Sequence, residues 1–171
     1  MRLRIIICHI LLLCMPGVLS AQKEYVGKTD KLSVHPRILL PKGEEKELKK
    51  QIRKDAIWTD VHMALLEEAD SIIQQPLNEC VIIGWRLLDV SRDNLRRIFI
   101  LSYAYRMTGN VRFAKRAEAE MLQAASFPDW NPQHFLDVGE MTMALAIGYD
   151  WLYDRLAEKS KEIIATAIIE K

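Results

Sequence analysis

Polar residues that interrupt an apolar stretch at 127–141 are the part of this sequence whose types and spacing best suit a functional site. If the chain is helical from residue 133 onward, His134, Asp137, Glu140 and Met141 fall on one face by three- and four-residue spacing. The rest of that helix is largely apolar, so this face would line a polar cavity. Buried polar groups without partners cost about 1–3 kcal/mol each, so these side chains require partners.

A structural role for the same residues is the other interpretation. Asp137 and Glu140 suit a helix N-terminus, where carboxylates interact favourably with the helix dipole, and His134 could be a hydrogen-bonded core residue. Trp130, in the loop before the helix, could stack on a sugar ring or fill the end of the core. A metal site is not predicted, because the His-x2-Asp-x2-Glu spacing lacks a second histidine.

Other residues capable of chemistry give weaker signals. Tyr103 and Tyr105 lie in a stretch that predicts a buried helix, so we expect them in the core. The segment 35–37 precedes an apolar turn, and Arg37 is expected to pair with an acidic residue. His62 lies on an amphipathic stretch and is expected to face solvent. The sequence contains no Gly-rich phosphate loop, nucleophile elbow or paired-cysteine motif.

Composition sets limits on the class of protein. Half of the 171 residues are hydrophobic and 27% are charged, which excludes an intrinsically disordered chain. Lys and Arg number 24 against 23 Asp and Glu, a formal charge of +1. This balance lacks the basic excess of a nucleic-acid-binding protein, so no nucleic-acid partner is predicted.

The first 21 residues have the pattern of a secretory signal peptide. Arg2 and Arg4 precede an apolar run at 5–15, and small residues follow it up to Ser20 and Ala21, where cleavage is expected. The run is shorter than the roughly 20 apolar residues of a membrane-spanning helix, so no integral membrane segment is expected after cleavage.

The mature chain is expected to start with a polar linker at 22–33. Cleavage removes Cys8 and Cys14 and leaves Cys80, so the exported protein would have no internal disulfide. Without the two arginines of the signal peptide, 22 basic residues remain against 23 acidic ones. These features indicate a periplasmic or secreted bacterial protein with an apolar core.

Helical periodicity dominates the rest of the chain and predicts an all-α fold. Ser91 is expected to cap one of the helices, and the two-residue turn at 109–110 predicts an antiparallel hairpin. Residues 81–83 could form a short strand or a turn of helix. The predicted helices cover residues 43–53, 56–75, 92–108, 111–126, 133–153 and 157 onward.

Successive antiparallel hairpins indicate an α/α toroid or an α-solenoid. No strict repeat of about 34 residues is visible, which disfavours a tetratricopeptide array. We expect residues 34–171 to form one domain, and the absence of a helix stop signal near its end indicates that the domain is truncated.

Four stretches carry a family resemblance: HPRILL at 35–40, RRIFILSYAY at 96–105, WNPQHFLDVGEM at 130–141 and AIGYDWLYD at 146–154. Together they resemble the N-terminal region of heparinase II/III-like polysaccharide lyases, most closely on the heparinase II side. Alginate lyases of the same architecture are also similar.

The resemblance implies an incomplete α/α toroid followed by β-sandwich domains. Such enzymes cleave uronic-acid-containing polysaccharides by β-elimination, in which Asn, His or Arg side chains neutralise the uronate carboxylate. A Tyr or His base removes the C5 proton, and a Tyr or His acid protonates the leaving oxygen. No cofactor is implied.

The resemblance also implies an acidic polysaccharide as the partner of the polar residues in the third stretch. Trp130, Asn131, His134, Asp137 and Glu140 would be the residues that contact this substrate. The catalytic Asn, His and Tyr residues would lie beyond the end of this sequence, so this piece alone is expected to be inactive.

Two other functions fit the same sequence. One is a non-catalytic helical module that binds glycans or another protein. The other is a different α/α-toroid enzyme, such as an unsaturated-uronide hydrolase with paired acidic catalytic groups.

Overall fold

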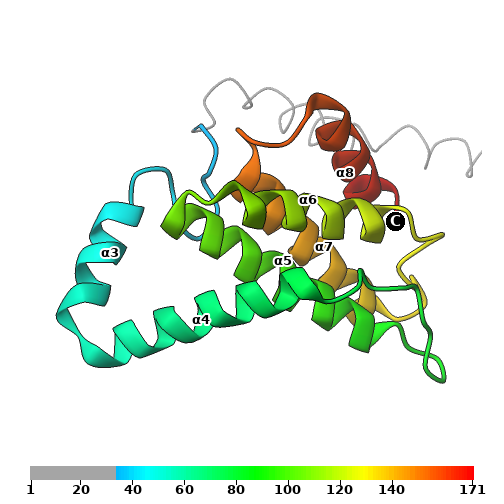
Figure 1. The fold of residues 1–171 in the computed structure, drawn as a ribbon. Coiled ribbons are helices and arrows are strands. Elements are labelled where there is room, and N and C mark those ends of the chain that lie inside the picture. Colours follow the sequence, from blue (N-terminus) through cyan, green and yellow to red (C-terminus); the bar gives the residue numbers. More distant parts are fainter. Residues whose placement is uncertain (1–33) are drawn as a thin grey trace, which may run out of the picture. The chain divides into compact units, whose positions relative to one another are not determined.

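The computed structural model describes residues 34–171, so the predicted signal peptide at 1–21 and linker at 22–33 lie outside the described residues. Within the described range the fold is all-helical, as predicted, and the only β-type pairing is an isolated bridge between Ile83 and Arg86. Figure 1 shows the helices in order: α3 (Glu45–Lys54), α4 (Ala56–Gln74), α5 (Leu88–Thr108), α6 (Val111–Ala125), α7 (Phe135–Leu152) and α8 (Glu158–Glu170).

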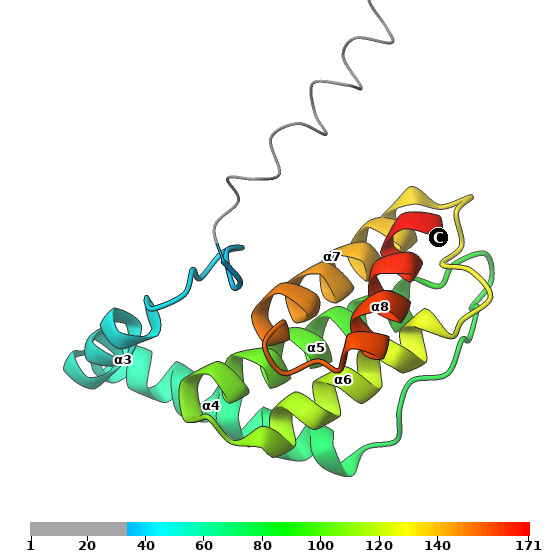
Figure 2. The same cartoon turned by 90° about the horizontal axis from the view of Figure 1, so that it is seen from above.

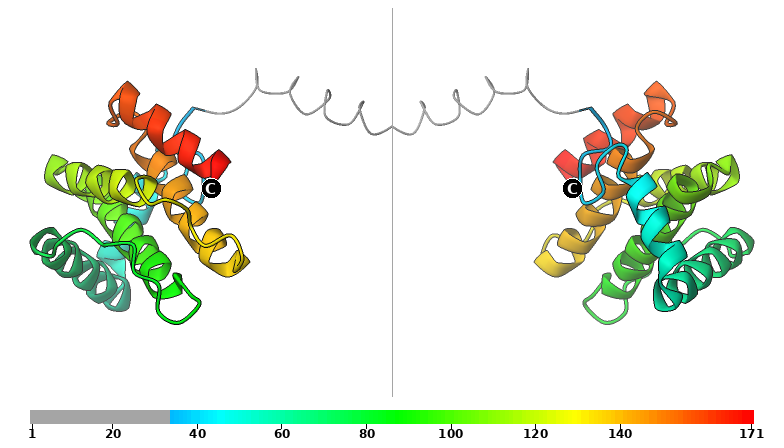
Figure 3. Two further views of the ribbon diagram at one scale, coloured as in Figure 1. Left: turned by 90° about the vertical axis from the view of Figure 1, so that its right-hand side faces the viewer. Right: turned by 90° about the vertical axis from the view of Figure 1, so that its left-hand side faces the viewer.

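Helix α5 lies at the centre and packs against α4, α6 and α7. Helix α8 contacts α6 and α7, on the side away from α4 (Figures 2 and 3). Because three helices cover α5, residues around most of its circumference are buried, and they include the polar side chains of Asn94, Arg97 and Arg106 as well as apolar ones. The largest fully buried apolar side chains are Ile72, Leu87, Ile98, Leu101, Met121, Trp130, Met141, Leu145, Leu152 and Ile164.

The predicted hairpin of α5 and α6 is present. Gly109 has a left-handed conformation with φ of 75°, and its N–H donates to the carbonyl of Tyr105 at 2.7 Å. Glycine adopts this conformation without the steric cost that a Cβ brings. Asn110 then caps α6, with Oδ1 accepting the N–H of Arg112 at 3.2 Å.

The prediction that Ser91 caps the following helix is wrong. Helix α5 begins at Leu88, and Ser91 is buried within its first turn. The N–H of the cap residue, Leu87, donates instead to the carboxylate of Asp137 on α7 at 2.7 Å. A carboxylate from another helix therefore satisfies the start of α5, which local sequence signals do not reveal.

Asp150 near the end of α7 anchors the segment before α3. Its Oδ1 accepts from Nδ1 of His35 at 2.5 Å, and its Oδ2 accepts the N–H groups of Arg37 and Ile38, each at 2.8 Å. Arg37 Nε lies 3.8 Å from Asp150 Oδ1, so the predicted acidic partner of Arg37 is present. The peptide bond between His35 and Pro36 is cis.

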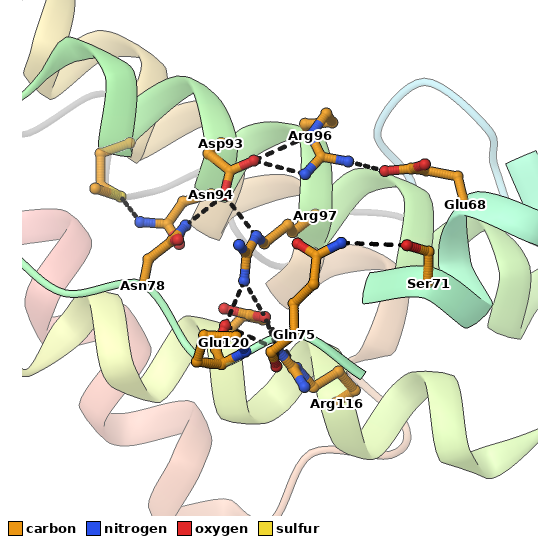
Figure 4. Close-up of polar contacts among 12 residues, drawn as sticks. Glu68, Ser71, Gln75, Asn78, Asp93, Asn94, Arg96, Arg97, Arg116 and Glu120 are labelled. Carbon is orange, nitrogen blue, oxygen red and sulfur yellow. Dashed lines mark hydrogen bonds and ion pairs between the residues drawn. The ribbon is translucent and has the colours of Figure 1, made fainter. Parts of the chain in front are cut away.

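A second polar network fixes the end of α4 against α5 and α6 (Figure 4). Arg116 donates to the carbonyls of Ile73 and Gln75 at 2.8 and 2.6 Å, and its Nε donates to the fully buried Glu120 at 2.9 Å. Arg97 Nη1 lies 3.4 Å from the same Glu120 oxygen. Because the buried carboxylate contacts two guanidinium groups, its charge is compensated, and the network has a structural role.

Candidate functional site

The carboxylate of Asp137 is the centre of a polar cluster at the start of α7. Asp137 is fully buried, and its Oδ1 accepts Nε and Nη2 of Arg86 at 3.0 and 2.7 Å. Its Oδ2 accepts Nδ2 of Asn131 at 2.8 Å and the N–H of Leu87. Burial alone would raise the pKa of Asp137, but the hydrogen bonds from Arg86, Asn131 and Leu87 lower it below its ordinary value. The group is therefore a buried, fully ionised anchor.

This anchor positions an exposed tryptophan. Ile83 and Arg86 exchange backbone hydrogen bonds of 2.9 and 3.1 Å around a tight turn, in which Gly84 has φ of 61°. Trp85 lies in this turn and is 82% exposed. The side chain of Asn131 donates to the carbonyl of Trp85 at 2.8 Å. Residues 83–86, here called the Trp85 loop, are therefore held on both sides by groups that also bind Asp137.

A second ion pair joins α5 to α7. Arg92 of α5 donates to Glu140 of α7 at 3.1 Å, and the Arg92 side chain is more than half exposed. With Arg86 and Asp137 the four residues carry no net charge. An anionic ligand would therefore have to compete with Glu140 for Arg92, and an exposed ion pair offers little resistance because water screens it.

Trp130 fills the core. It is fully buried, and its Nε1 donates to the carbonyl of Ala124 at 3.0 Å. Of the two roles that the sequence left open for Trp130, the structure shows the one in which its side chain fills the end of the core. The expectation that Trp130 stacks on a substrate is contradicted, because a fully buried indole offers no face to a ligand.

His134 precedes α7 rather than lying within it. It is the N-cap residue, its side chain makes no capping hydrogen bond, and its backbone N–H donates to the carbonyl of Asn131 at 2.9 Å. The ring is half-buried. His134 therefore lies in the same turn as Asn131. Because it precedes the helix, the three-residue helical spacing from His134 to Asp137 that was proposed from the sequence does not apply.

The other members of the predicted helix face do share one side of α7. Asp137 and Glu140 reach Arg86 and Arg92, and Met141 Sδ accepts from Asn94 of α5 at 3.6 Å. All these contacts are directed toward the start of α5. The polar cavity expected along this face is instead filled by protein partners.

Three residues of this region were missed in the sequence. Trp85, Arg86 and Arg92 carry the exposed aromatic surface and the two cations. The signal for Trp85 and Arg86 was a glycine followed by Trp-Arg in a stretch without helical periodicity, which marks a turn that presents a large side chain, whereas Arg92 lies within α5 and had no such signal. Their pairing with α7 joins residues about fifty positions apart, so no local pattern predicts it.

A histidine–tyrosine pair lies elsewhere, between α4 and α5. Nδ1 of His62 and the hydroxyl of Tyr103 are 2.9 Å apart, and both residues are half-buried. The prediction that His62 faces solvent is therefore wrong. Burial, and secondarily the charge of Lys49, lowers the pKa of His62, and burial raises the pKa of Tyr103. Both shifts favour the neutral forms, in which Tyr103 can donate to the imidazole.

Residues 34–171 contain no group of three or more His, Cys, Asp or Glu side chains arranged to hold a metal ion. No helix in the same range combines the length and apolar character needed to cross a membrane. In comparisons with known proteins, neither a family model nor a curated protein matches this chain.

Proposed function

We propose that this chain is the N-terminal part of a periplasmic or secreted polysaccharide lyase of the heparinase II/III-like group. The observation that carries the proposal is the Trp85 loop, which presents an 82% exposed indole beside Arg86 and Asn131. Its role would be to bind an acidic polysaccharide along one wall of the cleft.

The chemistry of the loop suits a uronate polymer. An exposed indole offers an apolar face that can cover a sugar ring, and its polar edge remains in contact with water. A guanidinium group binds a carboxylate by donating two parallel hydrogen bonds. Arg92, once released from Glu140, would therefore donate to a uronate carboxylate. The fixed position of the Trp85 loop on Asp137 lowers the entropy lost on binding.

The arrangement of the helices is compatible with part of an α/α toroid, which is the second element of the proposal. Consecutive helices contact each other in pairs, α3 with α4, α5 with α6 and α7 with α8. The family resemblance adds that β-elimination would be carried out by Asn, His and Tyr residues outside this sequence. This chain would then contribute binding and no chemistry of its own.

Binding of acidic oligosaccharides tests the role of the Trp85 loop. We expect the protein to bind alginate or heparan sulfate oligosaccharides. Trp85→Ala should weaken that binding at least tenfold, since a tryptophan that a ligand covers on binding is often a major contributor to affinity. Trp58→Ala is the matched control, because Trp58 is a 52% exposed tryptophan on α4. Equal affinities of the two variants would overturn the role of Trp85.

A second measurement separates a lyase from a non-catalytic binding module. The intact protein isolated from its source cells would be incubated with each polymer, and the ultraviolet absorbance of the unsaturated uronate product would be followed. A product, together with a mass above 19.8 kDa, supports the lyase. Binding without elimination by the intact protein would leave the binding module in its place.

A further inference from the structure

A pocket lies where residues 36–45 meet the ends of α5 and α7. Its cavity volume is about 220 Å³, and its walls include the aromatic rings of Tyr105 and Trp151. The Trp85 loop lies at the other end of α7, and the two ends are about 25 Å apart at 1.5 Å per residue. The pocket is therefore separate from the polysaccharide surface proposed above.

The charges that line this pocket do not cancel. Lys42 Nζ lies 3.3 Å from Asp154, and Arg106 Nη2 lies 2.5 Å from Glu45. Arg155 also lines the pocket, and within residues 34–171 no carboxylate lies within ion-pair distance of it. Three cations and two carboxylates leave one positive charge, which a single monoanion would neutralise.

Arg106 supplies a buried positive charge. Its side chain is only 2% exposed, and its guanidinium lies 4.8 Å from the ring centre of Trp151. Nε and Nη2 donate to Glu45, and Nη2 also contacts the carbonyl of Pro41 at 3.3 Å. Nη1 is buried and has no hydrogen-bond partner among the described residues. The charge of Arg106 is therefore incompletely compensated, and it is poorly screened because water does not reach it.

Arg155 lies at the exposed edge of the pocket. Its Nε donates to the hydroxyl of Tyr105 at 2.5 Å, and its guanidinium lies 5.7 Å from the ring centre of Tyr105. This contact orients the guanidinium and leaves both Nη groups without a protein partner in the described part of the chain. They are available to bind a carboxylate with two parallel hydrogen bonds.

We infer that this pocket is a second binding site, for a small organic monocarboxylate of the size of one sugar acid. Arg155 would bind the carboxylate directly, Arg106 would stabilise it through its buried charge, and Tyr105 and Trp151 would contact the body of the ligand. The inference does not depend on the proposed function, because it uses none of the residues at the start of α7.

Titration with sodium glucuronate, followed by NMR of the ¹⁵N-labelled protein, tests this site. We expect saturable shifts of the Arg155 side-chain signal and the Trp151 indole signal, with a dissociation constant on the order of millimolar for so small a ligand. Glucose, which lacks the carboxylate, should cause no saturable shift. Sodium sulfate distinguishes a site for organic carboxylates from one that accepts any anion.

Arg155→Gln should weaken glucuronate binding at least tenfold, since it removes a charge-assisted hydrogen bond. Lys159→Gln removes the same charge from an exposed side chain on the neighbouring helix α8 that does not line the pocket, and it should bind like the unmodified protein. Retained binding by Arg155→Gln, equal binding of glucose or sulfate, or no saturable shift at about 50 mM glucuronate would overturn the inference. Glucuronate binding that survives Trp85→Ala would show that the two sites act separately.

Discussion

Asp137 of α7 binds Arg86 through two hydrogen bonds to one carboxylate oxygen, 51 residues apart in the chain. The other oxygen of the same carboxylate holds Leu87 and Asn131. A single buried side chain therefore fixes the start of α5, the turn before α7 and the exposed Trp85 loop. The stability of this end of the molecule and the position of the exposed Trp85 side chain depend on the same group.

Replacement of Asp137 by Asn is expected to destabilise the protein by about 3 kcal/mol. The change leaves the Arg86 guanidinium without its carboxylate partner. The new amide group of residue 137 also faces groups that are themselves donors, so some of the N–H groups around it remain unsatisfied. Glu140→Gln is the control, because the pair with Arg92 is solvent-exposed and should contribute less than about 1 kcal/mol. Urea denaturation of the two variants measures both values, and equal losses would contradict a central role of Asp137.

The lowered pKa of Asp137 predicts loss of stability in acid. Because the pKa in the folded state lies below the ordinary value of 3.8, the unfolded state binds more protons than the folded state in this window. The stabilisation is complete above pH 3.8 and is lost as the pH falls through the lowered pKa. Asp93 and Glu45 have lowered pKa values as well, so the free energy of unfolding of Asp137→Asn should still fall in acid, but with a smaller slope against pH. Unfolding curves at a series of pH values should show a shallower slope for this variant, and an unchanged slope would contradict the assignment.

The all-α class, the hairpin at Gly109 and most helix ends were predictable from sequence, because they depend on local periodicity and turn residues. The start of α5 was not, because the acceptor for its backbone N–H at Leu87 is the side-chain carboxylate of Asp137 rather than the hydroxyl of Ser91. Trp130 illustrates a second limit. An indole beside polar residues has the same sequence pattern whether it stacks on a ligand or fills the core, and only the packing of α6 and α7 decides between them.

The pKa of His62 should respond to one neighbouring lysine. Burial is the main cause of its lowered pKa, and the positive charge of Lys49 adds to it. Lys49→Gln is therefore expected to raise the pKa of His62 toward its ordinary value of 6.5, as followed by NMR titration of the ring. Lys50→Gln is the control, since it removes the same charge from the adjacent, exposed position. A larger shift in the Lys50 variant would exclude Lys49 as the source.

Two glycines of α7 should respond in opposite directions to the same substitution. A Cβ at Gly148 would lie 2.5 Å from Met121 Sδ and 2.6 Å from Ile98 Cγ2, so a side chain there would force these residues of α6 and α5 to shift. Gly148→Ala is expected to cost about 1–3 kcal/mol, since the buried neighbours must move.

Gly139 is the matched control, because it lies in the same helix and a Cβ there would meet nothing within 4 Å. Gly139→Ala should stabilise the protein by about 0.5–1 kcal/mol, because alanine loses less backbone entropy than glycine when a helix forms. Thermal denaturation of both variants therefore separates helix propensity from packing. If Gly148→Ala were as stable as Gly139→Ala, the contact of α7 with Met121 and Ile98 would have to be looser than the structure indicates.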